Sequence, residues 1–162
     1  MKLTITALTI TTMIAAAGAS AFEIEGTLVG VKRADRFVVK TETGDRAEIQ
    51  LYGCKAHDDT PRSPSGQWSS AEVRDVLMGE KLRVIVHTEC NAVYTADVYW
   101  DRKKKHLNRW VLREGLCWYN PDEPDADLKK AADRATRYSK GYHRLPPDKP
   151  KSTFRGIILD GR

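Results

Sequence analysis

The feature that most constrains the fold is a short alternating stretch that ends at a glycine. Apolar and polar residues alternate over 46–51, which predicts a strand with one buried face. Gly53 then lets the chain turn out of the sheet, because glycine accepts backbone conformations that other residues avoid. Residues that leave a strand end on a rigid sheet are well placed for chemistry, so we expect functional side chains within Gln50–Asp58.

Turn and capping signals divide the rest of the chain into short elements. Ser69 with Glu72 three residues later predicts a helix start, and two further helices are expected from about Leu107 and Asp125. The predicted strands are 22–32, 37–41, 46–54, 82–87 and 93–100. Three strands, a helix, two strands and two helices predict an α+β fold, a five-stranded OB-type β-barrel with three helices.

The two ends of the chain differ in composition from its middle. Residues 1–21 join Lys2 to an apolar run and a small-residue cleavage pattern at Ala19–Ala21, which predicts a signal peptide. We therefore expect an exported protein, periplasmic or extracellular, with no membrane anchor after cleavage. Residues 22–144 are the predicted barrel domain, and the proline-rich residues 145–162 are expected to be disordered.

Cysteine content and charge limit the classes of partner. In an oxidising compartment Cys54, Cys90 and Cys117 allow one disulfide in any of three pairings, with one thiol left over. The formal net charge of +5 permits a polyanionic partner such as nucleic acid. Trp118 is expected in the core, whereas Trp68, in a predicted polar loop, is the aromatic residue placed to stack on a ligand.

Several segments, in this order and spacing, resemble the thermonuclease (staphylococcal nuclease-like) family. They are Leu51 with Gly53, Ala96–Tyr99, Asn108–Cys117, and Ala135 followed by Gly141–Tyr142. The resemblance covers most of the predicted domain. It implies a staphylococcal nuclease-like barrel and calcium-dependent hydrolysis of nucleic-acid phosphodiesters, with carboxylates on the metal and arginines on the phosphate.

This sequence departs from the family at the catalytic positions. Gln50 stands where the family has an arginine, Lys55 where it has a metal-ligand aspartate, and Asp58 where it has the catalytic glutamate. Asp35 aligns with a family metal ligand, with Arg33 and Arg36 on either side of it in the motif. Loss of one preorganised electrostatic group costs about 10²–10³ in rate, so we expect the family's mechanism to be lost.

The expected function is non-catalytic binding of nucleic acid, another polyanion, or an envelope protein, with no metal and no cofactor. Arg33, Arg36 and Lys55 are the candidate anion-binding residues. One alternative is a nuclease with a rearranged site at Asp35, Asp58 and Asp59, which would use calcium. Another is an accessory role in envelope or exopolysaccharide assembly. The family resemblance also favours a Cys54–Cys117 disulfide, which leaves Cys90 free.

Overall fold

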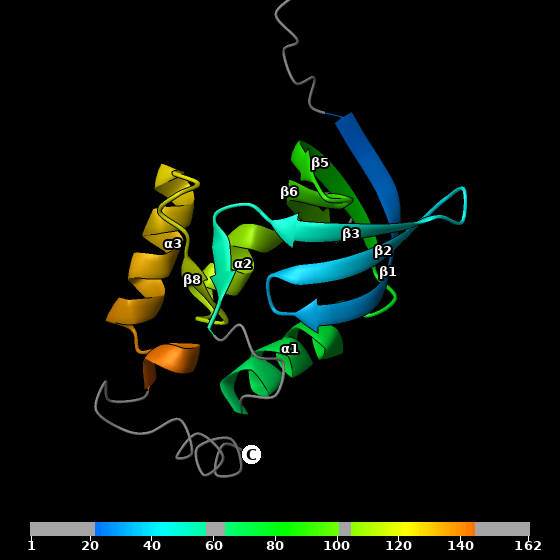
Figure 1. Cartoon of the computed structure of the whole chain (residues 1–162). Coiled ribbons are helices and arrows are strands. Elements are labelled where there is room, and N and C mark those ends of the chain that lie inside the picture. Colours follow the sequence, from blue (N-terminus) through cyan, green and yellow to red (C-terminus); the bar gives the residue numbers. More distant parts are fainter. Residues whose placement is uncertain (1–21, 58–63, 101–104, 145–162) are drawn as a thin grey trace, which may run out of the picture.

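The fold is organised by a six-stranded sheet that closes on itself (Figure 1). The computed structural model describes residues 22–57, 64–100 and 105–144. Neighbouring strands follow the order β3-β2-β1-β5-β6-β7. Their bounds are β1 Phe22–Arg33, β2 Arg36–Thr41, β3 Arg46–Leu51, β5 Lys81–Cys90, β6 Val93–Trp100 and β7 Lys105–His106.

Closure comes from a parallel pairing of β3 with β6. Glu48 lies opposite Val93 and Leu51 opposite Ala96, whereas the other pairs in the sheet are antiparallel. β1, β2, β3, β5 and β6 thus form a closed barrel, with one helix between the third and fourth of these strands. The prediction of an α+β, OB-type barrel with three helices is confirmed.

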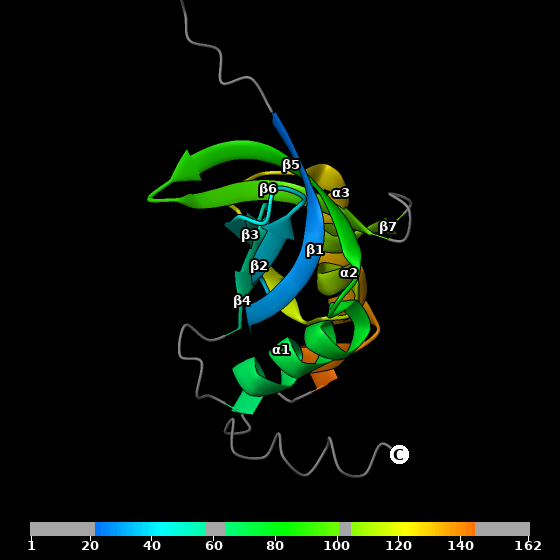
Figure 2. The same ribbon diagram turned by 90° about the vertical axis from the view of Figure 1, so that its right-hand side faces the viewer.

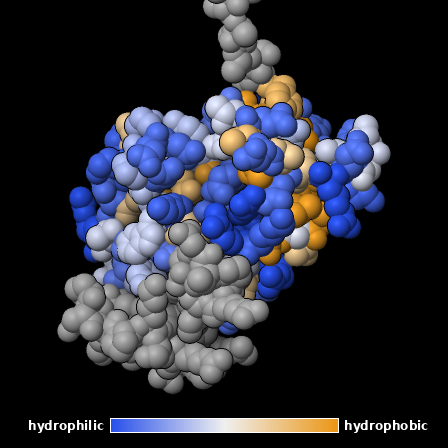
Figure 3. Space-filling model, in the orientation of Figure 1, coloured by the Kyte–Doolittle hydropathy of each residue, from blue (hydrophilic) through white to orange (hydrophobic). Residues whose placement is uncertain are grey.

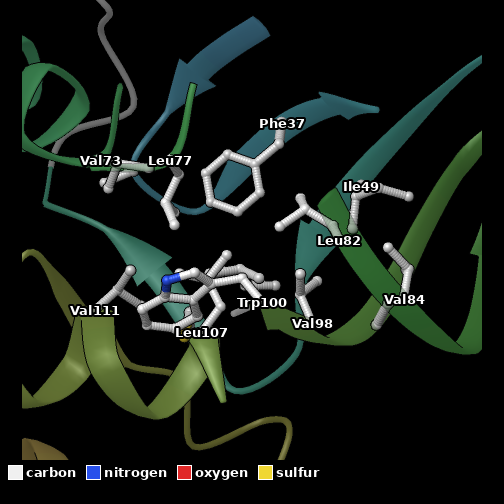
Figure 4. Close-up of a cluster of buried hydrophobic side chains, with 14 of the residues drawn as sticks. Phe37, Ile49, Val73, Leu77, Leu82, Val84, Val98, Trp100, Leu107 and Val111 are labelled. Carbon is white, nitrogen blue, oxygen red and sulfur yellow. The ribbon is translucent and has the colours of Figure 1, made fainter. Parts of the chain in front are cut away.

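The core fills the barrel and the spaces beneath two helices (Figure 4). Phe37, Val39, Ile49 and Leu51 point inward because side chains alternate along a strand, as predicted for residues 46–51. Burial of each large apolar side chain contributes about 1.5–3 kcal/mol. Helix residues complete the cluster: Val73, Leu77, Leu107 and Val111.

The first helix, α1, spans Pro64–Leu77 and starts earlier than predicted. The sequence placed its start at Ser69, but Ser69 is buried inside the helix and its hydroxyl donates to the carbonyl of Gly66 at 3.2 Å. Proline is well tolerated in the first turn of a helix, where its missing N–H has no partner to lose. Residues 64–68, which were predicted as part of a polar loop, therefore form the first turns of α1, and Trp68 packs half-buried against the core.

The remaining elements lie beside the barrel. A two-stranded sheet pairs β4 (Cys54–Ala56) with β8 (Cys117–Tyr119). The strand predicted over 46–54 is therefore divided into β3 and β4, and β8 was not predicted. The helix α2 spans Leu107–Arg113, α3 spans Ala126–Arg137, and the short 3-10 helix η1 spans Gly141–Arg144. The helix α3 starts next to Asp125, as predicted, and the Asp125 carboxylate caps it by accepting hydrogen bonds from the N–H groups of Asp127 and Leu128.

In the view turned by 90° the hairpin of β5 and β6 extends beyond the other strands (Figure 2). Its turn contains Asn91 and Ala92, both with positive φ, which is common at the centre of two-residue hairpin turns. No helix among the described residues is long and apolar enough to span a membrane. The predicted signal peptide (1–21) and tail (145–162) lie outside the described residues.

Candidate functional site

Asp35 lies at the turn between β1 and β2 and is only 1% exposed. Oδ1 of its carboxylate accepts a hydrogen bond from Arg33 Nε at 3.0 Å, and Oδ2 accepts from Arg33 Nη2 at 3.2 Å. Gln50 Nε2 and the backbone N–H of Ala56 also donate to Oδ2, at 3.1 Å and 2.8 Å. A buried carboxylate is stable when charged donors and amides satisfy it, and this one is fully engaged by protein groups.

The cations around Asp35 are also engaged. Arg33 is held on Asp35, while Lys32 and Arg36 both form ion pairs with Glu48 on β3. The hydrogen bond from Lys32 is the largest effect on the pKa of Glu48; with the charge of Arg36 it outweighs burial and lowers that pKa. Of the three predicted anion-binding residues, Arg33 and Arg36 therefore lie in internal ion pairs and Lys55 is exposed.

Lys55 faces an exposed tryptophan across the small sheet. It lies directly opposite Trp118 in the β4–β8 pairing, and Trp118 is 38% exposed. Trp118 was expected in the core, and this prediction is wrong. In β8 Cys117 points inward and Trp118 outward, because successive side chains of a strand point to opposite faces.

Three further rings surround Trp118. His57, Tyr142 and His143 meet its indole ring edge to face, with ring centroids 4.6, 5.2 and 4.9 Å away. His57 also stacks on Tyr142 at 4.5 Å. We call the set Lys55, His57, Trp118, Tyr142 and His143 the Lys55–Trp118 face.

The backbone of Gly115 fixes this face. Its carbonyl accepts hydrogen bonds from His57 Nε2 at 2.8 Å and from the N–H of Tyr142 at 3.1 Å. Gly115 and Gly141 both have positive φ, and a Cβ on Gly115 would lie 2.4 Å from the carbonyl oxygen of Lys140. Only glycine fits this close crossing, so Gly115 and Gly141 position the rings. Burial lowers the pKa of His143 within the face.

The cysteines do not form the expected disulfide. Cys54, Cys90 and Cys117 are all free thiols. Cys54 lies opposite Tyr119 and Cys117 lies opposite Ala56, so the two cysteines are diagonal neighbours in an antiparallel pair. Diagonal neighbours are about 7–8 Å apart, beyond the usual Cα separation of about 4.4–6.8 Å in a disulfide. Burial, the largest cause, raises the pKa of both thiols well above the ordinary value.

A second polar cluster lies on the outer face of β5, β6 and β7. Asp97 Oδ2 is 3.0 Å from His87 Nε2, and Asp97 Oδ1 is 3.1 Å from His106 Nε2. Burial raises the pKa of Asp97, but the hydrogen bonds and charges of His106 and His87 together outweigh it and lower the pKa. The buried Asn108 donates to Asp97 Oδ1 and to the carbonyl oxygens of Tyr52 and Ala96, which joins the end of β3 to the middle of β6.

The carboxylates of the alternative nuclease site are not all described. Asp58 and Asp59 lie outside the described residues, and Asp35 is occupied as stated above. Within 22–57, 64–100 and 105–144, no group of three or more His, Cys, Asp or Glu residues is arranged to hold a metal ion.

Comparison with known proteins adds no assignment. No protein-family model matches the sequence, and no curated protein matches it significantly.

Proposed function

We propose that this chain is an exported protein of staphylococcal nuclease-like fold that binds a polyanion, in particular single-stranded nucleic acid, without cleaving it. The OB-type closure of the barrel and the segments that resemble the thermonuclease family support the fold. The observation that best supports the loss of catalysis is the hydrogen bonding of the Asp35 carboxylate. Arg33, Gln50 and Ala56 occupy the carboxylate that the resemblance assigns to metal binding.

The Lys55–Trp118 face supplies the two contacts that a nucleotide strand needs. An exposed ammonium group contributes a salt-dependent attraction to phosphate, and an exposed indole ring offers a stacking surface to a base of any sequence. Alanine substitution of such a stacking residue costs about 1–3 kcal/mol per base. The close packing of Trp118 against three rings limits its motion, which lowers the entropy lost on binding.

The test is the binding of fluorescent oligothymidylate to the purified chain at low and high salt. We expect Lys55→Ala to weaken binding and reduce its salt dependence, and Trp118→Ala to weaken binding by about tenfold or more. Trp118→Phe should retain most of the affinity, because phenylalanine also stacks. Lys40→Ala, which removes an exposed charge from β2, is the matched control and should have little effect.

A cleavage assay with the same oligonucleotide, in calcium and in chelator, decides between binding and catalysis. Intact oligonucleotide under both conditions supports a binding module. Calcium-dependent cleavage by the wild-type chain would overturn the proposal and favour the nuclease alternative. Equal losses of affinity in Lys55→Ala and Lys40→Ala would show that net charge alone attracts the ligand.

A further inference from the structure

The helix α3 presents a second cationic surface, away from the Lys55–Trp118 face. Lys130, Arg134 and Arg137 follow one another at helical spacing, so they share one side of the helix. The opposite side carries Leu128, Ala131 and Ala135, all buried. Figure 1 shows α3 at the outer edge of the molecule with β8 and α2 on its inner side, and Figure 3 shows that the surface there is largely hydrophilic.

Two adjacent hollows lie along the C-terminal half of this helix. The first has a volume of about 440 Å³ and is lined by Lys130, Asp133, Arg134, Arg137 and Tyr138. The second has a volume of about 250 Å³ and is lined by Arg113, Glu114, Arg134, Tyr138 and Lys140. Arg134 and Tyr138 belong to both. We call the cations of the two hollows, together with Tyr138, the α3 surface.

The carboxylates in these hollows are already paired. Glu114 forms ion pairs with Arg113 and Lys140, and Asp133 pairs with Lys129. Arg134 and Arg137, in contrast, form no ion pair with any carboxylate in the part of the chain that the structure describes. The α3 surface thus has two guanidinium groups that can bind a ligand. Each can hold a carboxylate or phosphate with two parallel hydrogen bonds.

Tyr138 distinguishes the α3 surface from an ordinary charged helix end. Cations are favoured in the last turn of a helix because they offset its dipole, and this alone accounts for Arg134 and Arg137. It does not account for Tyr138, which is 61% exposed and lies with its ring centroid 5.7 Å from the guanidinium of Arg134. Exposed tyrosine next to arginine is typical of the residues that dominate protein-protein binding energy.

We propose that the α3 surface binds an acidic segment of a partner protein, whose carboxylates pair with Arg134 and Arg137 and whose backbone or apolar side chains pack on Tyr138. The α3 surface consists of two small adjoining hollows that share Arg134 and Tyr138, whereas a nucleic-acid strand needs an unbroken basic groove. A peptide can place acidic and neutral residues to suit both hollows.

The experiment measures binding of a short fluorescein-labelled peptide of glutamate interspersed with glycine and leucine, by anisotropy at low salt. We expect Arg134→Ala/Arg137→Ala to weaken binding by about tenfold or more, since both bidentate partners are lost. Tyr138→Ala should weaken it several-fold. Arg134→Lys/Arg137→Lys keeps the charge and should restore only part of the affinity, because lysine lacks the planar fork.

The matched control is Lys40→Ala/Arg46→Ala, which removes two exposed charges from neighbouring positions of β2 and β3. It should change binding by less than about twofold, since surface charges away from a contact act only weakly through salt solution. Equal losses in the two alanine pairs would overturn the proposal, because net charge would then explain the binding. Full affinity in Arg134→Lys/Arg137→Lys would also overturn the proposal, because charge alone would then be sufficient.

Oligothymidylate and vesicles of anionic phospholipid serve as competing ligands. If either binds more tightly than the peptide and loses its affinity in Arg134→Ala/Arg137→Ala, the partner is a nucleic acid or a membrane and the proposal fails. Oligothymidylate binding that depends on Lys55 and Trp118 but not on Arg134 or Arg137 agrees with two separate surfaces. The two proposals can therefore fail independently.

Discussion

The backbone N–H of Ala56 donates a hydrogen bond to Oδ2 of Asp35 at 2.8 Å, which joins the end of β4 to the turn between β1 and β2. The carbonyl of Asp35 in turn accepts from the N–H of Leu51 at 2.9 Å. One buried residue thereby holds the ends of β3 and β4 in place. The side chain that the family resemblance aligned with a metal ligand is thus an anchor for the strand that carries Lys55.

Replacement of Asp35 should therefore destabilise the fold. In Asp35→Ala the guanidinium of Arg33, the amide of Gln50 and the N–H of Ala56 all lose their acceptor in a part-buried site. We expect a loss of about 3 kcal/mol in the free energy of unfolding, measured with urea. Asp75→Ala on α1, where the carboxylate is exposed, is the control and should change stability by less than about 0.5 kcal/mol. Equal stability of the two variants would contradict the anchoring role.

The barrel could be predicted from local patterns, whereas the site could not. The strand over 46–51 and the start of α3 near Asp125 both depend on residues close in sequence, so their signals are visible there. The pairing of Lys55 with Trp118 joins segments that are far apart and are set side by side only by the register of β4 with β8. The β8 strand is too short for an alternating pattern to show whether Trp118 faces the solvent or the core.

The same limit explains the wrong disulfide prediction. A family resemblance placed Cys54 and Cys117 on neighbouring segments, and they are neighbours, but the register offsets them by two residues. Local sequence patterns do not determine the register of two strands that are far apart along the chain. They also missed the start of α1 at Pro64. Arg33 was read as free to bind anions, because nothing in its local sequence reveals that Asp35 is buried beside it.

Gly115 should tolerate no side chain. Gly115→Ala places a Cβ 2.4 Å from the carbonyl oxygen of Lys140 and also requires a positive φ of 68°. We expect a loss of about 3 kcal/mol or more in the free energy of unfolding. Oligonucleotide binding should also weaken, because His57 and Tyr142 both hydrogen-bond to the carbonyl of Gly115. Gly44→Ala is the control. Its φ is 95°, but a Cβ added there would meet no neighbouring atom within 4 Å, so only backbone strain of about 1–2 kcal/mol remains. A similar cost for both variants would show that the close crossing adds nothing.

Asp97 should make the protein sensitive to acid. Its pKa in the folded state is below the ordinary value of 3.8, so its contribution is fully present above pH 3.8 and is lost as the pH falls through the folded pKa. Asp97→Asn removes the charge and should lower the free energy of unfolding at neutral pH by about 1–2 kcal/mol. The difference between variant and wild type should shrink below about pH 4. A constant difference from neutral to acid pH would contradict this assignment.

The three thiols should differ sharply in reactivity. Cys90 is exposed at the end of β5, whereas Cys54 and Cys117 are buried and burial raises their pKa, so few of their thiolates form. In the folded protein a thiol-specific chromogenic reagent should modify Cys90 quickly and the other two only at the rate of unfolding. Cys90→Ser should abolish the fast phase and leave two thiols that react in denaturant. If denatured wild-type protein instead presents a single reactive thiol, Cys54 and Cys117 are bonded to each other, and the free-thiol arrangement of β4 and β8 is wrong.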